Sequence, residues 1–132
     1  MTLLELMVGI SILSILLLIA WPKIGQISSG YNLRAAAREV ATDLQFARLL
    51  AVKENRDFQV SCAGSSYQVV RVSDGFVAKS RNFTPDYPGI SITNTSVTFN
   101  SRGNASTGTI SVSNPYGTRN VTVGSTGRVK MQ

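Results

Sequence analysis

Residues 1–22 read MTLLELMVGISILSILLLIAWP, and Glu5 is the only charged residue among them. As an α-helix, the stretch from Leu6 to Pro22 rises about 25 Å, slightly less than the ~30 Å hydrocarbon core of a bilayer. Adding residues 1–4 makes the helix long enough to cross, so we expect one membrane-spanning segment. A polytopic membrane protein is excluded because the chain has no second apolar segment of this kind. A secretory signal peptide fits poorly, because no cationic residue precedes the apolar run and Ala20-Trp21-Pro22 is a poor cleavage site.

The rest of the chain is polar, rich in Ser, Thr, Asn and Gly, and basic. The 132 residues carry a net charge of +6, and no acidic residue follows Asp86. The cations beyond that point are Arg102, Arg119, Arg128 and Lys130. A basic terminal half of this kind binds nucleic acid, anionic lipid or an acidic partner, or it serves solubility alone. The sequence leaves both readings open.

The sequence contains few residues that are suited to catalysis or to metal binding. The chain contains no histidine, which removes the usual general base, the usual zinc ligand and the Ser-His-Asp arrangement. Cys62 is the only cysteine and lies in an alternating apolar stretch, which is typical of a small buried side chain rather than a nucleophile. We therefore expect no enzyme, no cofactor and no metal site.

Glu5 is unusual because it lies inside an apolar helix. A carboxylate at the middle of a membrane costs ~2.5–3.5 kcal/mol on insertion scales, and less near the interface. One interpretation places Glu5 at the interface. The other gives it a positive partner, which is either the N-terminal amine of its own Met1 or that of a neighbouring copy. A buried pair of this kind specifies register more than it adds stability.

The helical pattern continues beyond the apolar segment. Pro22, Gly25 and Gly30 predict a kink or local unwinding within residues 18–30. After them, apolar residues recur at steps of three and four, which is the spacing of one helix face. These residues are Leu33, Ala37, Val40, Leu44, Ala47 and Ala51. We expect this face to cover a sheet and the helix to end at Asn55.

After residue 55 the hydrophobic period changes to two, which is typical of β-strands. The expected strands, separated by Gly, Pro, Asn and Asp, are 58–62, 67–69 with 70–72, 90–92, 97–99, 110–112, 121–123 and 129–131. This pattern predicts an α+β fold in which a long N-terminal helix packs on a C-terminal antiparallel β-sheet head. The expected parts are a membrane or filament-core helix (1–22), its amphipathic continuation (23–55) and the head (56–132).

Two groups of residues now carry a family resemblance. Met1-Thr2-Leu3-Leu4-Glu5-Leu6, followed by the apolar helix, resembles the mature N-terminus of a type IV pilin or pseudopilin. The helix residues 43–48 and 51–53, together with the Gly-Arg-containing segment 127–130, resemble the GspH/FimT group of minor pilins and pseudopilins. The resemblance covers most of the chain and is weakest from about residue 74 to residue 114.

The resemblance implies a structural subunit of a type IV pilus-like filament or of a type II secretion pseudopilus. It implies a prepilin peptidase that releases residue 1, which is then N-methylated, unless Met1 is an initiator. It assigns assembly roles to Glu5 and Met1, and to Pro22 and Gly25 in a stretch that melts on assembly. The partners would be other copies or other pilins. The location would be the bacterial inner membrane, with a single pass and an external head, and then a periplasmic or extracellular filament.

Two alternatives remain. Relatives in the FimT branch bind DNA during uptake through a basic C-terminal strand, a part that Arg128 and Lys130 would play here together with Arg102 and Arg119. The other interpretation is that these cations lie on the solvent-facing side of an edge strand, where charge discourages aggregation. The second alternative is a monomeric membrane-tethered domain in which Glu5 is dispensable. The calcium loop of major pseudopilins is not expected, because no carboxylate follows Asp86.

Overall fold

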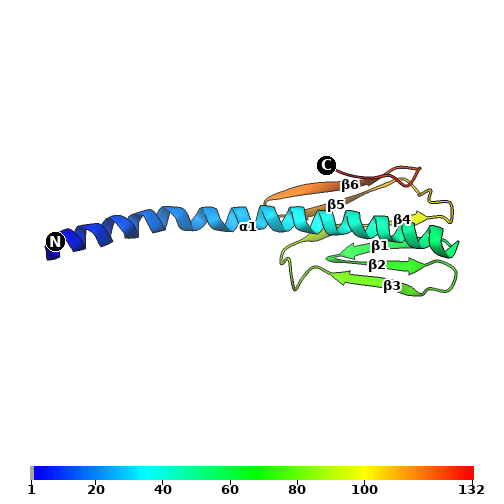
Figure 1. Ribbon diagram of the computed structural model, residues 1–132, viewed down its shortest axis with the longest axis horizontal. Helices are drawn as coiled ribbons and strands as arrows, with labels where there is room; N and C mark the ends of the chain where they lie inside the picture. The colour runs from blue at the N-terminus through cyan, green and yellow to red at the C-terminus, as the bar shows by residue number, and fades with distance from the viewer. Residues whose placement is uncertain (1) are drawn as a thin grey trace.

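The computed structural model describes residues 2–132, except for the side chains of Pro22, Lys23, Ile24 and Gln26. A single long helix, α1 (Leu3–Glu54), precedes a seven-stranded sheet, and the first half of the helix projects away from it (Figure 1). The strands are β1 (Phe58–Gly64), β2 (Ser66–Arg71), β3 (Val77–Asn82), β4 (Ser91–Phe99), β5 (Gly108–Asn114), β6 (Gly117–Val123) and β7 (Val129–Met131). The α+β fold with a helix on an antiparallel sheet is confirmed.

Both ends of α1 have recognisable caps. At the start, Thr2 has an extended backbone and its hydroxyl accepts a hydrogen bond from the backbone N–H of Glu5. At the end, Asn55 adopts the left-handed conformation (φ 53°), and its N–H is directed to the carbonyls of Ala51 and Val52. Asparagine tolerates this conformation better than most residues, which explains why the helix ends where the sequence predicts.

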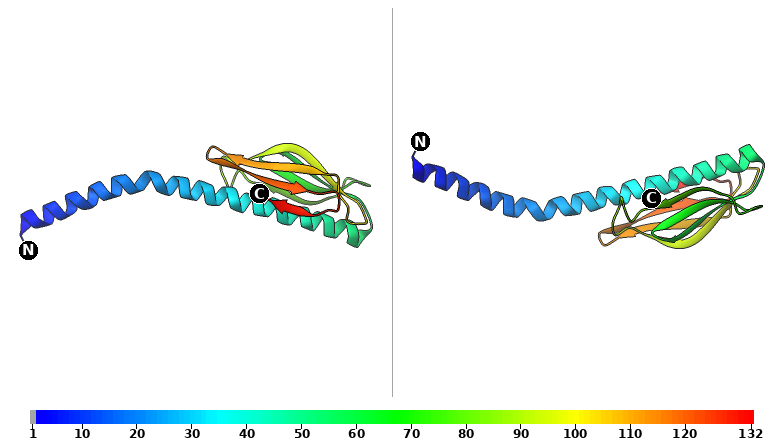
Figure 2. Two further views of the ribbon diagram at one scale, coloured as in Figure 1. Left: turned by 90° about the horizontal axis from the view of Figure 1, so that it is seen from above. Right: turned by 90° about the horizontal axis from the view of Figure 1, so that it is seen from below.

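The helix is bent but unbroken. Figure 2 shows a bend between the apolar half and the half that carries the sheet. The sequence predicted a kink or local unwinding within residues 18–30, and the helix continues through this range without an unwound turn. The role expected of Pro22 remains a prediction, because its side chain lies outside the described residues.

The second half of α1 buries the predicted stripe. All six of its members are at most 5% exposed, and Ala36 joins them. Opposite them lie the large side chains of the sheet, including Phe58, Phe99 and Ile110, each fully buried. Burial of an aliphatic or aromatic side chain contributes about 1.5–3 kcal/mol, so helix and sheet share one core that neither would form alone.

The sheet has the strand order β3-β2-β1-β4-β5-β6-β7, with antiparallel pairing throughout. β4 joins two halves of the sheet. Its first residues, Ser91 and Ile92, pair with β5, whereas Ile92 and the stretch from Thr95 to Phe99 pair with β1. α1 runs across one face and contacts both halves, namely β1 and β4 on one side and β5, β6 and β7 on the other.

Two details of the strand prediction are wrong. The predicted strands 90–92 and 97–99 form one continuous strand, β4, and Ile90 precedes it. β3 was missed, because its sequence VAKSRN has no apolar alternation and it lies at the sheet edge with mostly exposed residues. Its backbone pairs with β2, and charged side chains attach it to α1, as described below.

Candidate functional site

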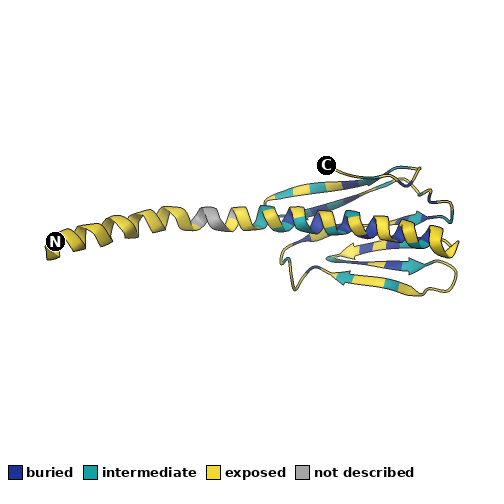
Figure 3. Cartoon of the chain, viewed as in Figure 1, coloured by how far each residue is buried: buried dark blue, intermediate teal, exposed yellow. Residues whose placement is uncertain are grey.

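The apolar half of α1 is uncovered by the rest of the chain. Residues Leu3–Trp21 have a mean hydropathy of 2.6, and none of them is buried (Figure 3). Trp21 is 79% exposed and Leu18 is 76% exposed. An apolar surface of this length requires a membrane or other apolar helices around it. By length and composition, this segment is able to cross a membrane.

Glu5 forms a capping box with Thr2. The Thr2 N–H donates to Glu5 Oε2 at 3.4 Å, and the Glu5 N–H donates to Thr2 Oγ1 at 3.3 Å. The carboxylate therefore lies at the positive end of the helix dipole, where a negative charge is favourable. Sequence reasoning missed Thr2, although Thr-x-x-Glu before an apolar run is the signature of this cap. Glu5 is exposed, and among residues 2–132 its carboxylate accepts a hydrogen bond only from the Thr2 N–H.

The other residues with predicted assembly roles are placed only in part. Met1 and the Pro22 side chain lie outside the described residues. Gly25 lies within α1 and is exposed, and a Cβ added there would meet no atom within 4 Å. Gly25 therefore weakens the helix by about 1 kcal/mol relative to alanine without any packing reason in the single chain.

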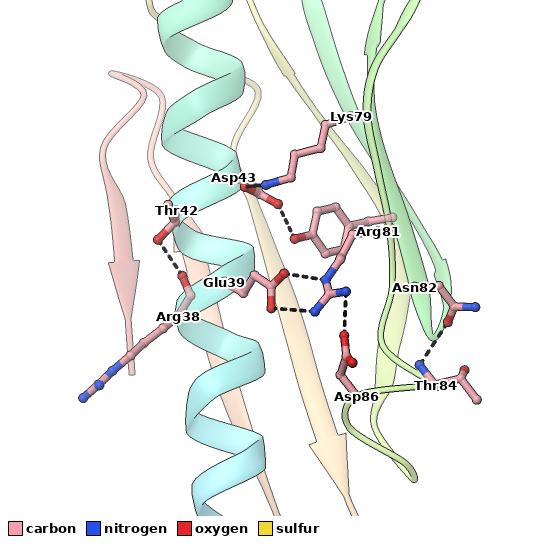
Figure 4. A network of polar contacts seen from close by, with 10 residues as sticks. Arg38, Glu39, Thr42, Asp43, Lys79, Arg81, Asn82, Thr84 and Asp86 are labelled. Atoms are coloured by element: carbon pink, nitrogen blue, oxygen red, sulfur yellow. Dashed lines mark hydrogen bonds and ion pairs between the residues drawn. The ribbon is translucent and has the colours of Figure 1, made fainter.

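A network of charged groups attaches the sheet edge to α1 (Figure 4). Asp43 on α1 is 2% exposed, and its carboxylate accepts hydrogen bonds from the hydroxyl of Tyr67 and from Lys79 Nζ, the latter at 2.6 Å. One turn earlier, Glu39 pairs with Arg81. Burial raises the pKa of Tyr67 above its usual value, and the hydrogen bond to Asp43 raises it further. A buried carboxylate is costly without partners, so the burial of Asp43 requires the hydrogen bonds from Tyr67 and Lys79. The same bonds hold this edge of the sheet against α1.

On the opposite side of α1, a groove of about 500 Å³ separates the last helical turns from the C-terminal segment. Its lining comes from α1, from the loop between β4 and β5, and from the approach to β7. The residues are Gln45, Arg48, Leu49, Val52, Arg102, Gly103, Gly127, Arg128 and Val129. The groove thus combines three arginines with an aliphatic floor.

Two glycines set the width of this groove. Arg48 Nε donates to the Gly103 carbonyl at 2.9 Å, and this carbonyl lies directly against Gly127. A Cβ added to Gly127 would lie 2.1 Å from that carbonyl oxygen and 2.8 Å from Arg48 Nε. Gly127 also has a positive φ of 78°. Both its conformation and its close contact therefore require glycine.

The structure brings together two of the four candidate DNA-binding residues. Arg102 and Arg128 line the groove, and Arg48 joins them. Arg119 lies on β6 opposite Val112, and Lys130 lies on β7 opposite Thr122, so neither lines the groove. β7 begins at Val129, which places Arg128 in the preceding turn rather than in the strand. The sequence did not connect Arg48 with the C-terminal cations, because they lie far away in the chain.

The charges of the head and of the helix half that packs on it divide into paired and unpaired groups. Of the six acidic side chains that follow Glu5 in the chain, five form ion pairs, and Arg71, Lys79 and Arg81 supply all of these contacts. Within residues 2–132, the four cations after Asp86 form no ion pair. They are Arg102, Arg119, Arg128 and Lys130. The groove side of the head therefore presents positive charge without compensation.

Residues 36–127, which include most of the head and the buried half of α1, match the family described as type II transport protein GspH. This chain belongs to the GspH family. No curated protein sequence matches it.

Solved structures with this fold include two crystal forms of the type IV minor pilin FimU of Pseudomonas aeruginosa. One is 19% identical, with a TM-score of 0.59 over 75% of this chain and 91% of FimU. The other is 18% identical, with a TM-score of 0.65 over 80% and 92%. The minor pseudopilin EpsH of the Vibrio cholerae type 2 secretion system is 14% identical, with a TM-score of 0.62 over 76% of this chain and 96% of EpsH. At these identities the likeness establishes the shared fold.

Proposed function

We propose that this chain is a structural subunit of a type IV pilus-like filament or of a type II secretion pseudopilus, and that it assembles through α1. The observation that carries the proposal is the division of one unbroken helix. Its first half is apolar and exposed, whereas its second half is the core of a folded head. Such a helix requires apolar partners outside the chain and transmits their position to the head. Membership of the GspH family supports the same conclusion.

In this proposal the subunit waits in the inner membrane, with a single pass and an external head, and then joins a periplasmic or extracellular filament whose core is made of these helices. Residues 1–22 form the membrane and filament-core part, residues 23–55 the amphipathic continuation, and residues 56–132 the head. Leader removal by a prepilin peptidase and methylation of residue 1 follow from the resemblance. Mass spectrometry of the first residue tests both.

Glu5 has the central role in assembly. Its carboxylate accepts the Thr2 N–H of its own helix. In the filament it also pairs with the N-terminal amine of a neighbouring copy, and this pair sets the axial stagger between helices. We expect Glu5→Val to insert into membranes normally but to enter filaments poorly, measured by recovery of the variant in sheared filaments against membrane fractions.

A matched variant separates the two contacts of Glu5. Thr2→Val removes the hydroxyl that accepts the Glu5 N–H, at a cost of about 1 kcal/mol in helix capping, but keeps the carboxylate. Its incorporation should stay close to wild type. Equal loss in both variants would assign the effect to the cap, and normal incorporation of Glu5→Val would remove the inter-subunit role. A monomeric membrane-tethered domain would give no recovery of the wild type in filaments.

A second candidate function is DNA binding during uptake, because Arg48, Arg102 and Arg128 line one groove without carboxylate partners among the described residues. Phosphate contacts by arginine produce binding that is independent of sequence and weakens with salt. Among the described residues, no aromatic side chain lines the groove, so stacking contributes little.

The test is a gel shift of the full chain in detergent over a salt series. The double variant Arg102→Gln with Arg128→Gln should make the fall of the logarithm of the binding constant with log salt shallower, by up to about 2 in slope. Each phosphate contact contributes roughly 0.9 to this slope. Arg119→Gln with Lys130→Gln removes the same charge outside the groove and should change the slope less. Absence of binding at low salt ends this hypothesis.

A further inference from the structure

One exposed face of α1 runs from just beyond the apolar segment into the half that packs on the sheet. Ile27, Tyr31, Arg34 and Arg38 recur at steps of four, three and four, so they share this face, which we call the interfacial face. Ile27 and Tyr31 are each 72% exposed, and both arginines are exposed. Two adjoining hollows run along it, and Tyr31 and Arg34 line both. The face therefore combines apolar and aromatic surface with two positive charges.

The two positive charges of this face are uncompensated. Among the described residues, neither Arg34 nor Arg38 forms an ion pair. The acidic side chains nearest in sequence, Glu39 and Asp43, lie on another side of the helix and pair with Arg81 and Lys79. The interfacial face therefore fits a negatively charged partner.

Its height above the membrane follows from helix geometry. If Glu5 lies at the inner interface, the ~30 Å hydrocarbon core takes about 20 residues and ends near Gly25. Tyr31 and Arg34 then follow about 9 and 14 Å further along the axis. Helical side chains lean toward the helix N-terminus, which here is the direction of the bilayer. Arginine and tyrosine thus reach back into a headgroup layer that is about 5–8 Å deep.

The bend of α1 also turns the interfacial face toward the bilayer. In both views of Figure 2, the sheet lies on the convex side of the bend. The face of α1 that is free of the sheet is therefore on the concave side. When the apolar half is upright in a membrane, the concave side of the second half inclines toward the bilayer surface, which also brings Arg38 closer to it.

We propose that the interfacial face binds the phosphate groups of anionic lipids at the outer surface of the membrane. This contact holds the head at a fixed inclination while the subunit waits for assembly. The proposal rests on the membrane-anchored state of the proposed function and adds a lipid partner to it. It uses Tyr31 as an interfacial anchor and Arg34 and Arg38 as the phosphate-binding groups.

The experiment uses the full chain in nanodiscs of phosphatidylcholine, with or without phosphatidylglycerol, and with a nitroxide quencher on the lipid headgroups. Trp21 is the only tryptophan, so Trp21→Phe with Tyr31→Trp moves the single reporter to the interfacial face. We expect stronger quenching with phosphatidylglycerol. Each arginine near an anionic surface favours the docked state about fivefold, so Arg34→Gln with Arg38→Gln should lower the docked-to-undocked ratio about 25-fold.

Two controls accompany this measurement. Lys53→Gln with Lys130→Gln removes the same charge away from the interfacial face and should leave the quenching unchanged. Trp21→Phe with Leu49→Trp places the reporter on the same helix about 27 Å further along, where no quenching is expected. In the wild type, quenching of Trp21 by acyl-chain-labelled lipid reports insertion separately.

The outcomes distinguish this inference from the proposed function. Quenching that is equal in the two lipids, or that survives the double arginine substitution, overturns the lipid contact while insertion and filament incorporation still support the subunit role. Loss of the Trp21 insertion signal overturns both the lipid contact and the membrane-anchored state of the proposed function. Quenching that depends on phosphatidylglycerol and is lost only in the Arg34/Arg38 variant supports the inference.

Discussion

Gly127→Ala is the sharpest test of how the groove is built. An alanine at φ 78° costs about 1–2 kcal/mol, because L-residues avoid the left-handed region. The new Cβ would also lie 2.1 Å from the Gly103 carbonyl oxygen, so that backbone has to move. Movement breaks the Arg48–Gly103 hydrogen bond, and a hydrogen bond to a charged group contributes about 1.5–3 kcal/mol. Together these effects lower the free energy of unfolding by about 3–5 kcal/mol.

A matched glycine isolates the steric part of this cost. Gly75 has a similar φ of 72°, but a Cβ added there would meet nothing within 4 Å. Gly75→Ala should therefore lower the free energy of unfolding only by the conformational cost of about 1–2 kcal/mol. For a head of this size, each kcal/mol lowers Tm by about 4–8 °C. The assay is thermal unfolding of the full chain in detergent, followed by near-ultraviolet circular dichroism of the head. Gly127→Ala should melt roughly 12–40 °C below wild type. Equal shifts in the two variants would refute the close contact between Gly127 and Gly103.

Three further predictions use the same unfolding assay. Asp43→Ala leaves Tyr67 and a charged partner without their acceptor and should cost about 3–5 kcal/mol, whereas Asp86→Ala on the exposed side should cost less than about 1 kcal/mol; equal costs would contradict the burial argument. Burial raises the pKa of Cys62 to about 11 from 9.0, so the unfolded chain loses this proton first and stability should fall by up to roughly 2 kcal/mol between pH 9 and pH 11. Tyr67, whose pKa is also raised, acts in the same direction, and Cys62→Ala should flatten the lower part of the decline; an unchanged profile would contradict this assignment. Asn55→Gly should leave stability nearly unchanged and Asn55→Val should cost about 1–2 kcal/mol, because the helix cap is left-handed; equal stability of the two would contradict that conformation.

Much of the fold follows from local pattern. The apolar stripe of α1 was predicted residue by residue, because a helix face and its burial follow directly from spacing. The end of α1 at Asn55 was predicted for the same local reason. β3 was not predicted, because its place depends on backbone pairing with β2 and on ion pairs to α1, and neither leaves an apolar period in the sequence.

For the basic groove too, the sequence predicts one part and the tertiary packing decides the other. The sequence identifies Arg102, Arg119, Arg128 and Lys130 as uncompensated cations, since no acid follows Asp86. The resemblance placed Arg128 and Lys130 together in a basic C-terminal strand, but β7 begins only at Val129, so Arg128 precedes the strand. Which cations converge is decided by the packing of α1 against the β4–β5 loop and the approach to β7.

By itself, the sequence determined an apolar helix with one embedded acid, an amphipathic continuation and a basic β-rich head, because charge, period and composition are local properties. Only the tertiary structure decided that Arg48 meets Arg102 and Arg128, that Gly127 must be glycine, and that Asp43 is buried against the sheet edge. These are contacts between segments 24 to 80 residues apart in the chain, and they depend on how helix and sheet pack rather than on any pattern along either one.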